Sequence, residues 1–149
     1  MMEFCMKPIG VIHTPFKEIP GTPIQSSRST ASGEIEIFPE YEAGLESIEG
    51  LSHLILIYIF HLALNSTELM VKPFLDNTQH GVFSTRFYRR PNSIGLSVVR
   101  LTERNGLNLK IQNVDMLDGT PLLDIKPYVP EFDVHTVEKL GWYANRAHP

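Results

Sequence analysis

A segment rich in arginine and aromatic residues lies near the middle of the chain, at residues 81–97. It carries Arg86, Arg89 and Arg90 together with Phe87 and Tyr88. Arginine binds anionic oxygens through a fixed fork of donors, and its planar face stacks on bases and aromatic rings. A proline after the arginines keeps the preceding residue out of the helical region. We therefore predict an ordered, extended loop between strands that presents cations, although an exposed basic turn fits the same pattern.

A second candidate site is the acidic pair Asp115 and Asp118, which flanks Met116 and Leu117. Paired acceptors beside apolar side chains could hold an amine or a ribose diol while the apolar groups pack on a purine. Asp118 is followed by a glycine, however, and this dipeptide also forms turns, with Asp115 as a cap. Residue chemistry alone leaves both interpretations open.

His61 ends the longest apolar run, residues 54–60, and its side chain could face a cavity as a catalytic base. It could equally be a histidine whose hydrogen bonds are satisfied at the end of a barrel. The histidines show no HExxH spacing and no CxxC partner, so we predict no zinc site. Neither a Gly-x-Ser-x-Gly motif nor a glycine-rich phosphate loop occurs, which argues against a serine nucleophile and a Rossmann nucleotide site.

Size and composition indicate an ordinary soluble domain. A chain of 149 residues predicts a single domain with a sizeable core. The formal net charge of −4 argues against wholesale coating of nucleic acid but allows a local basic patch. The single cysteine, Cys5, excludes an internal disulfide and suits a reducing compartment. We expect no secretion signal and no membrane span, and hence a cytoplasmic protein.

The elements that must position these residues are mostly strands. Alternation and β-branched composition predict strands at 8–13, 33–38, 51–61, 67–73, 94–104, 107–113 and 121–128. The continuous apolar composition of 51–61 predicts a strand buried on both faces. We expect a long loop at 18–30, a helical turn within 39–50 and a weak helical patch at 134–143.

Asn105 and Gly106 separate two of these strands and predict a hairpin with a type I′ turn, in which both turn residues have positive φ. Even spacing and tight turns favour a closed or nearly closed barrel. The predicted fold is therefore all-β, a small antiparallel β-barrel with minor helices.

Five motifs, in order over residues 6–133, resemble the TsaA-like family, which includes YaeB and TrmO. They are PIGVIHTPF at 8–16, PIQ at 23–25, LSHL at 51–54 with FH at 60–61, GVFSTR at 81–86 with RPNSIGLS at 90–97, and DMLDGTPLLDIKPY at 115–128. The resemblance implies a homodimeric β-barrel that binds S-adenosylmethionine without a Rossmann fold. It also implies methylation of N6 of the threonylcarbamoyl-adenosine beside the tRNA anticodon.

The resemblance implies the contacts to the methyl donor, and residue chemistry supplies candidates for the other two roles that this reaction needs. Either Asp118 or His61 would accept the N6 proton. Arg89, Arg90, Phe87 and Tyr88 would hold the unstacked base of the anticodon loop. The contacts to S-adenosylmethionine would come from Pro23, Ile24, Gln25, Phe60, His61, Arg86, Leu96, Asp115, Met116, Leu117 and Asp118.

Bacterial members of the family carry a further C-terminal domain, whereas this chain is expected to be one barrel domain over residues 1–149. That difference leaves two other functions open. One is an S-adenosylmethionine-binding module without turnover on tRNA. The other is a methyltransferase for a different, smaller acceptor.

Overall fold

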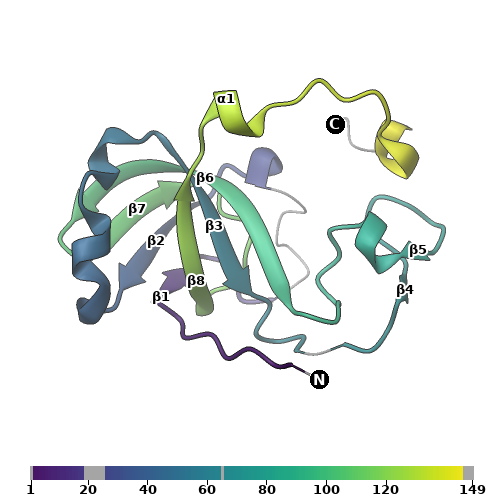
Figure 1. Ribbon diagram of the computed structural model, residues 1–149, viewed down its shortest axis with the longest axis horizontal. Helices are drawn as coiled ribbons and strands as arrows, with labels where there is room; N and C mark the ends of the chain where they lie inside the picture. Colours follow the sequence, from purple (N-terminus) through teal and green to yellow (C-terminus); the bar gives the residue numbers. More distant parts are fainter. Residues whose placement is uncertain (1, 19–25, 65, 146–149) are drawn as a thin grey trace.

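Six antiparallel strands close into a barrel, shown in Figure 1, in the computed structural model, which describes residues 2–18, 26–64 and 66–145. The order around the barrel is β1-β2-β7-β6-β3-β8, and β1 therefore pairs with both β2 and β8. The predicted all-β barrel is confirmed. Its strands are β1 (Gly10–His13), β2 (Ser32–Ile37), β3 (His53–Ile59), β6 (Ile94–Asn105), β7 (Asn108–Gln112) and β8 (Thr120–Pro127).

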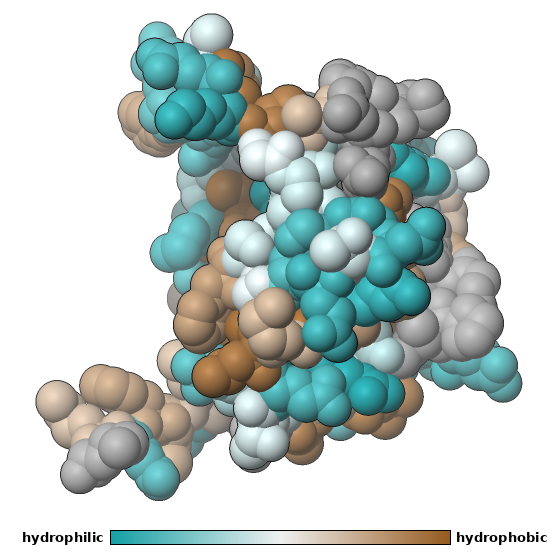
Figure 2. Space-filling view, turned by 90° about the vertical axis from the view of Figure 1, so that its right-hand side faces the viewer, coloured by the Kyte–Doolittle hydropathy of each residue, from teal (hydrophilic) through white to brown (hydrophobic). Residues whose placement is uncertain are grey.

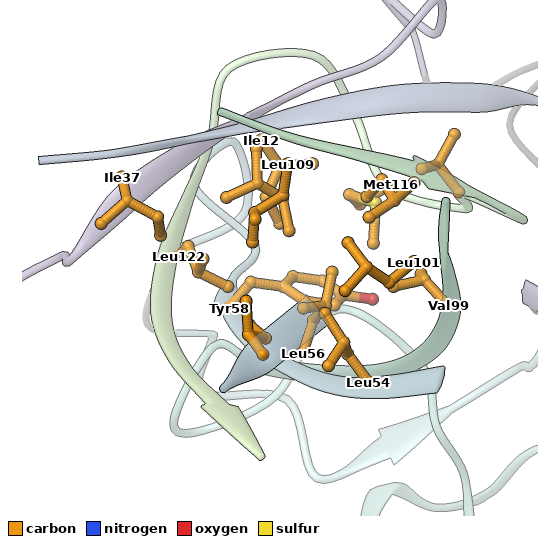
Figure 3. Close-up of a cluster of buried hydrophobic side chains, with 14 of the residues drawn as sticks. Ile12, Ile37, Leu54, Leu56, Tyr58, Val99, Leu101, Leu109, Met116 and Leu122 are labelled. Carbon is orange, nitrogen blue, oxygen red and sulfur yellow. The ribbon is translucent and has the colours of Figure 1, made fainter. Parts of the chain in front are cut away.

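Alternation along the strands supplies the core. Every second side chain of a strand points into the barrel, and most of these inward positions are apolar. Figure 3 shows the resulting cluster, in which the Tyr58 ring lies among aliphatic side chains. Its fully buried members include residues of five strands, namely Ile12, Ile35, Leu54, Leu56, Val99 and Leu109.

The prediction that residues 51–61 are buried on both faces is wrong for the outer face. Leu54, Leu56 and Tyr58 are buried in the barrel, but Ile55 and Ile57 are only half-buried. A barrel strand has one face toward the interior, and its outer face is covered only where another element packs on it. The apolar outer face of β3 is thus partly open.

The hairpin between β6 and β7 is confirmed, but its turn lies one residue later than predicted. Asn105 pairs with Asn108, so Gly106 and Leu107 form the two-residue turn. Gly106 has φ of +60°, and glycine with positive φ at the first turn position is the pattern of a type II′ turn. The predicted type I′ turn is wrong because Asn105 continues the strand instead of adopting positive φ.

Replacing Gly106 by alanine is expected to destabilise the fold by about 1–2 kcal/mol, because an L-residue pays that penalty in the left-handed region. The free energy of unfolding in urea measures the effect. Gly50→Ala is the matched control, since Gly50 lacks positive φ and no described atom lies within 4 Å of its added Cβ. Equal stabilities of the two variants would contradict the turn assignment.

Residues 66–93 form a small lobe that lies beside the barrel in Figure 1. The strand predicted at 67–73 is reduced to β4 (Met70–Val71), which pairs with β5 (His80–Gly81). After β5 come a 3-10 helix, η4 (Val82–Ser84), and an irregular loop that leads into β6. The predicted extended loop is therefore partly helical at its start.

The remaining helices are short. The helical turn predicted within 39–50 is confirmed as two 3-10 helices, η2 (Pro39–Leu45) and η3 (Ile48–Gly50), and η1 (Ser26–Arg28) is a third. The patch predicted at 134–143 is mostly wrong, because α1 (Pro130–Asp133) ends before it and η5 (Gly141–Asn145) begins near its end. Among the described residues, each helix is too short to cross a membrane.

Candidate functional site

A cavity of about 860 Å³ is lined by residues of the barrel, of the lobe and of the C-terminal segment. The barrel contributes the ends of β3 and β6 and the segment that follows β7. Most of the predicted site residues meet here although they are far apart in the sequence. Those that line the cavity are Phe60, His61, Arg86, Phe87, Tyr88, Arg90, Leu96, Asp115, Met116 and Leu117.

The other predicted residues fall into two groups. Pro23, Ile24 and Gln25 lie outside the described residues. Arg89 and Asp118 are described, but neither is among the residues that line the cavity.

A buried hydrogen-bond chain leads from the core to the cavity. Ser97 Oγ donates to Asp115 Oδ1 at 2.5 Å, and the Tyr58 hydroxyl lies 2.8 Å from Ser97 Oγ. Because the single proton of Ser97 serves Asp115, the Tyr58 hydroxyl donates to Ser97. Burial raises the pKa of Tyr58 far above its usual value, and the charge of Asp115 adds to the shift. Tyr58 is therefore a neutral donor at the inner end of a chain that leads through Ser97 to Asp115.

Gly95 makes this chain possible. It pairs with Tyr58 across β3 and β6, and the Tyr58 ring lies over it. A Cβ added at Gly95 would come within 2.3 Å of Tyr58 Cε2 and 2.9 Å of Phe60 Cζ. Only a glycine admits both rings at this point of the cavity wall.

Aromatic rings from the lobe and from the end of β3 continue the wall. The Tyr88 ring lies 6.3 Å from Phe60 and 6.0 Å from Phe74, measured between centroids, and is nearly parallel to Phe74. Phe87 contacts both Tyr88 and Phe74. The Arg89 guanidinium lies 5.5 Å from the centre of the Tyr88 ring. Figure 2, which faces the side of the molecule on the right of Figure 1, shows apolar surface interspersed with polar residues.

Arg90 organises the loop from inside. Its Nη1 donates to the carbonyl oxygens of Thr85 at 3.1 Å and Phe87 at 2.9 Å, and its side chain is half-buried. These two bonds hold together the irregular loop that follows η4. They also make Arg90 a residue that shapes the loop.

The C-terminal segment is a part of the site that sequence analysis did not predict. Leu140, Trp142 and Tyr143 line the cavity. Trp142 Nε1 donates to the carbonyl oxygen of Ser84, and the Arg86 backbone N–H donates to the Tyr143 hydroxyl. In the sequence, only the neighbouring aromatic residues Trp142 and Tyr143 distinguish this weakly periodic segment. Two adjacent aromatic residues do not indicate that the segment contacts η4.

Asp118 has partners outside the cavity. Its Oδ1 accepts the backbone N–H of Thr14 at 3.0 Å, and its Oδ2 accepts Lys17 Nζ at 2.6 Å. The hydrogen bond from Lys17 is the main cause that lowers the pKa of Asp118, and the bond from Thr14 adds to it. In this position Asp118 joins the segment after β7 to the region of β1, and Gly119, with φ of +81°, follows it in a turn before β8. The alternative role of Asp115 as a cap is not seen, because Asp115 lines the cavity.

Acidification should therefore weaken the fold partly through Asp118. Because its pKa is lower in the folded protein than in the unfolded chain, its stabilisation is complete above the unfolded pKa and is lost as the pH falls through the folded pKa. Between pH 7 and pH 3, the free energy of unfolding is expected to fall less for Asp118→Asn than for the wild type. The difference should be under about 1 kcal/mol, because the Asp118–Lys17 pair is exposed. Urea unfolding at both pH values measures this, with Glu46→Gln as control. Equal losses in wild type and Asp118→Asn would contradict the expectation.

Comparisons with known proteins identify similar chains. Residues 11–134 match the family model described as the tRNA-methyltransferase O N-terminal domain. A probable S-adenosyl-L-methionine-binding protein from Pyrococcus abyssi is 54% identical over 148 residues, which are 99% of this chain and 80% of that protein. The tRNA (adenine(37)-N6)-methyltransferase of Escherichia coli K12 is 36% identical over 140 residues, 87% of this chain and 60% of that enzyme.

A solved structure has the same architecture. The crystal structure of TrmO from Pseudomonas aeruginosa matches with a TM-score of 0.81 at 38% identity, covering 99% of this chain and 65% of that one. The chain thus spans less than two thirds of the two bacterial proteins but most of the archaeal relative.

Proposed function

This chain belongs to the tRNA-methyltransferase O family, and from that premise we propose that it transfers a methyl group from S-adenosylmethionine to N6 of threonylcarbamoyl-adenosine in the tRNA anticodon loop. The observation that carries the proposal is the cavity between barrel and lobe, where Arg86 and Asp115 meet apolar and aromatic walls. Each feature has a counterpart in the methyl donor.

The residues present fit S-adenosylmethionine by their chemistry. A guanidinium such as that of Arg86 pairs with the donor's carboxylate. The Asp115 carboxylate suits its ammonium group or its ribose diol. The cavity of about 860 Å³ lies within the usual range for ligand sites. Apolar contacts to the adenine and to the methylene groups beside the sulfonium would come from Phe60, Leu96, Met116 and Leu117.

When bound, the donor supplies a methyl group already activated by its sulfonium, so the chain has mainly to position the acceptor and remove one proton. Positioning alone can contribute roughly 7–11 kcal/mol to lowering a barrier. We assign to His61 the role of accepting the N6 proton, because His61 lines the cavity. Asp118 does not line it and is hydrogen-bonded to Thr14 and Lys17. A histidine exchanges protons readily near neutral pH.

The acceptor adenine would lie on the aromatic wall of the lobe. Phe74 is 57% exposed, and with Phe87 and Tyr88 it offers ring faces to an unstacked base. Arg89, stacked on Tyr88 and exposed, is placed to meet a phosphate or the anionic substituent of the modified base. A tRNA substrate would place the protein in the cytoplasm, which is the compartment we propose.

We also propose a homodimer formed through the outer face of β3 and β6. Ile57 pairs with Leu96 and Ile55 with Val98 there, and Leu96 is 45% exposed. Partly exposed apolar side chains on adjacent strands can be buried against the same face of a second copy of the chain. Because Leu96 also lines the cavity, the second subunit would lie beside the site.

Methyl transfer tests the proposed function directly. The purified protein is incubated with labelled S-adenosylmethionine and tRNA that carries the threonylcarbamoyl group, and the label on the nucleoside is measured. The matched control is the same tRNA without that group, for which no transfer is expected. Absence of transfer to the modified tRNA by folded protein would refute the proposal.

A second candidate function is binding of S-adenosylmethionine without turnover. It is supported by two relatives that the chain covers over 80% or more of their length. The one from Pyrococcus abyssi is named a probable S-adenosyl-L-methionine-binding protein, and the one from Archaeoglobus fulgidus an S-adenosyl-L-methionine-binding protein. Calorimetry separates the two candidates, because binding of the donor without transfer to any tRNA would favour the second.

A further inference from the structure

The C-terminal segment crosses from the barrel to the lobe and is attached there at one point. Figure 1 shows residues 134–140 running from α1 above the barrel to η5 beside the lobe. Val134, Val137 and Leu140 are 59%, 58% and 45% exposed, so this crossing stretch buries little apolar surface. Segments with few buried contacts open at low free-energy cost. The position of the segment therefore depends on its attachment at η5.

Stacked rings and hydrogen bonds make this attachment. The Trp142 ring stacks on the ring of His80, with centroids 4.8 Å apart, and on that of Tyr143, with centroids 3.9 Å apart. Trp142 Nε1 donates to the Ser84 carbonyl at 2.8 Å. The Tyr143 hydroxyl accepts the backbone N–H of Arg86 at 3.2 Å.

Both hydrogen bonds fall on residues 84–86, the stretch that ends with Arg86. Arg86 in turn lines the same cavity as Leu140, Trp142 and Tyr143. The attachment thus fixes the backbone of a residue that our proposed function assigns to the donor's carboxylate. It also adds one wall to the cavity.

We propose that Trp142 and Tyr143 are positioning residues of the methyl-donor site, an inference that rests on the function proposed above. They hold the backbone of residues 84–86 so that the Arg86 side chain is directed into the cavity. Since coupling between two equilibria is reciprocal, donor bound to Arg86 also holds the C-terminal segment in place.

Two conservative variants test the positioning role. Tyr143→Phe removes only a hydroxyl, and Trp142→Phe removes the indole N–H with its five-membered ring while keeping an aromatic ring beside His80. Each is expected to raise the Kd for S-adenosylmethionine about 2- to 12-fold, the effect of one lost hydrogen bond. The KM for the donor should rise similarly, while kcat at saturating donor stays near the wild-type value. Tyr128→Phe is the matched control, because Tyr128 is half-buried but does not line the cavity.

Coupling is tested on the wild-type chain. Trp142 is the only tryptophan of the sequence, so fluorescence quenching by acrylamide reports on this segment alone. Trypsin cleavage after the exposed Lys139 gives a second readout. Saturating S-adenosylmethionine is expected to lower quencher access and to slow this cleavage.

The outcomes separate the two proposals. A wild-type chain that does not bind S-adenosylmethionine refutes the proposed function. A wild-type chain that binds it, with unchanged Kd in both variants and unchanged quenching of Trp142, overturns the positioning role alone. Thermal melting checks that both variants are folded.

Discussion

Replacing Arg86 by alanine is expected to weaken binding of S-adenosylmethionine by roughly 10- to 150-fold, because a hydrogen bond to a charged group contributes about 1.5–3 kcal/mol. Arg86 lines the cavity together with Arg28, Arg90 and Asp115, and the charges of Arg86 and Asp115 both act on the buried Tyr58 hydroxyl. Calorimetric titration with the donor measures the change. The fold should be little affected, since the Arg86 side chain is exposed.

Two further variants make the result specific. Arg86→Lys keeps the charge but loses the fork of donors, so intermediate binding is expected. Arg100→Ala removes an exposed arginine from β6 that does not line the cavity and should bind the donor as the wild type does. If Arg86→Ala and Arg100→Ala have the same affinity, Arg86 does not recognise the carboxylate.

Gly95→Ala is expected to destabilise the protein by about 1–3 kcal/mol, the usual cost of overpacking, or somewhat more. The added Cβ would lie 2.3 Å from Tyr58 Cε2 and 2.6 Å from Tyr58 Cζ, so the ring has to move. Movement of the ring would also break the hydrogen bond to Ser97 that supports Asp115. We therefore expect weaker donor binding together with the loss of stability. Urea unfolding and calorimetry measure the two effects.

A control and a rescue variant accompany this test. Gly44→Ala adds the same methyl group where no described atom lies within 4 Å of it, and it should leave the free energy of unfolding nearly unchanged. Tyr58→Leu in the Gly95→Ala background removes the ring, so the two substitutions should destabilise less than the sum of their separate effects. Strict additivity would show that the ring and the new methyl group do not compete for space.

The strands were predictable because alternation between inward and outward side chains is a local property. Residues 33–38 and 107–113 alternate clearly, and both form barrel strands. The type of turn after Arg104 was less predictable. The choice between Asn105 and Gly106 as first turn residue depends on the register of β6 against β7, which local pattern does not determine.

The candidate site was predictable only where a residue carries its own chemical signal. Arg86 and Asp115 attract attention by their charges, and the cavity brings them together. Tyr58, Ser97 and Trp142 acquire their roles only through contacts across the fold, such as the approach of Ser97 to Asp115. The same limit applies to Asp118, whose ammonium partner Lys17 lies on a distant part of the chain.

The closure of the barrel has a consequence for how the chain folds during synthesis. β1 is completed by pairing with β8, where Gly10 faces Leu122 from the other end of the sequence. This contact has very high sequence separation, and such contacts slow folding because a long loop must be closed first. One edge of the earliest strand thus has to wait until β8 has left the ribosome. We expect the barrel to close only after β8 has been synthesised, with chaperone protection of that waiting edge favouring a high yield.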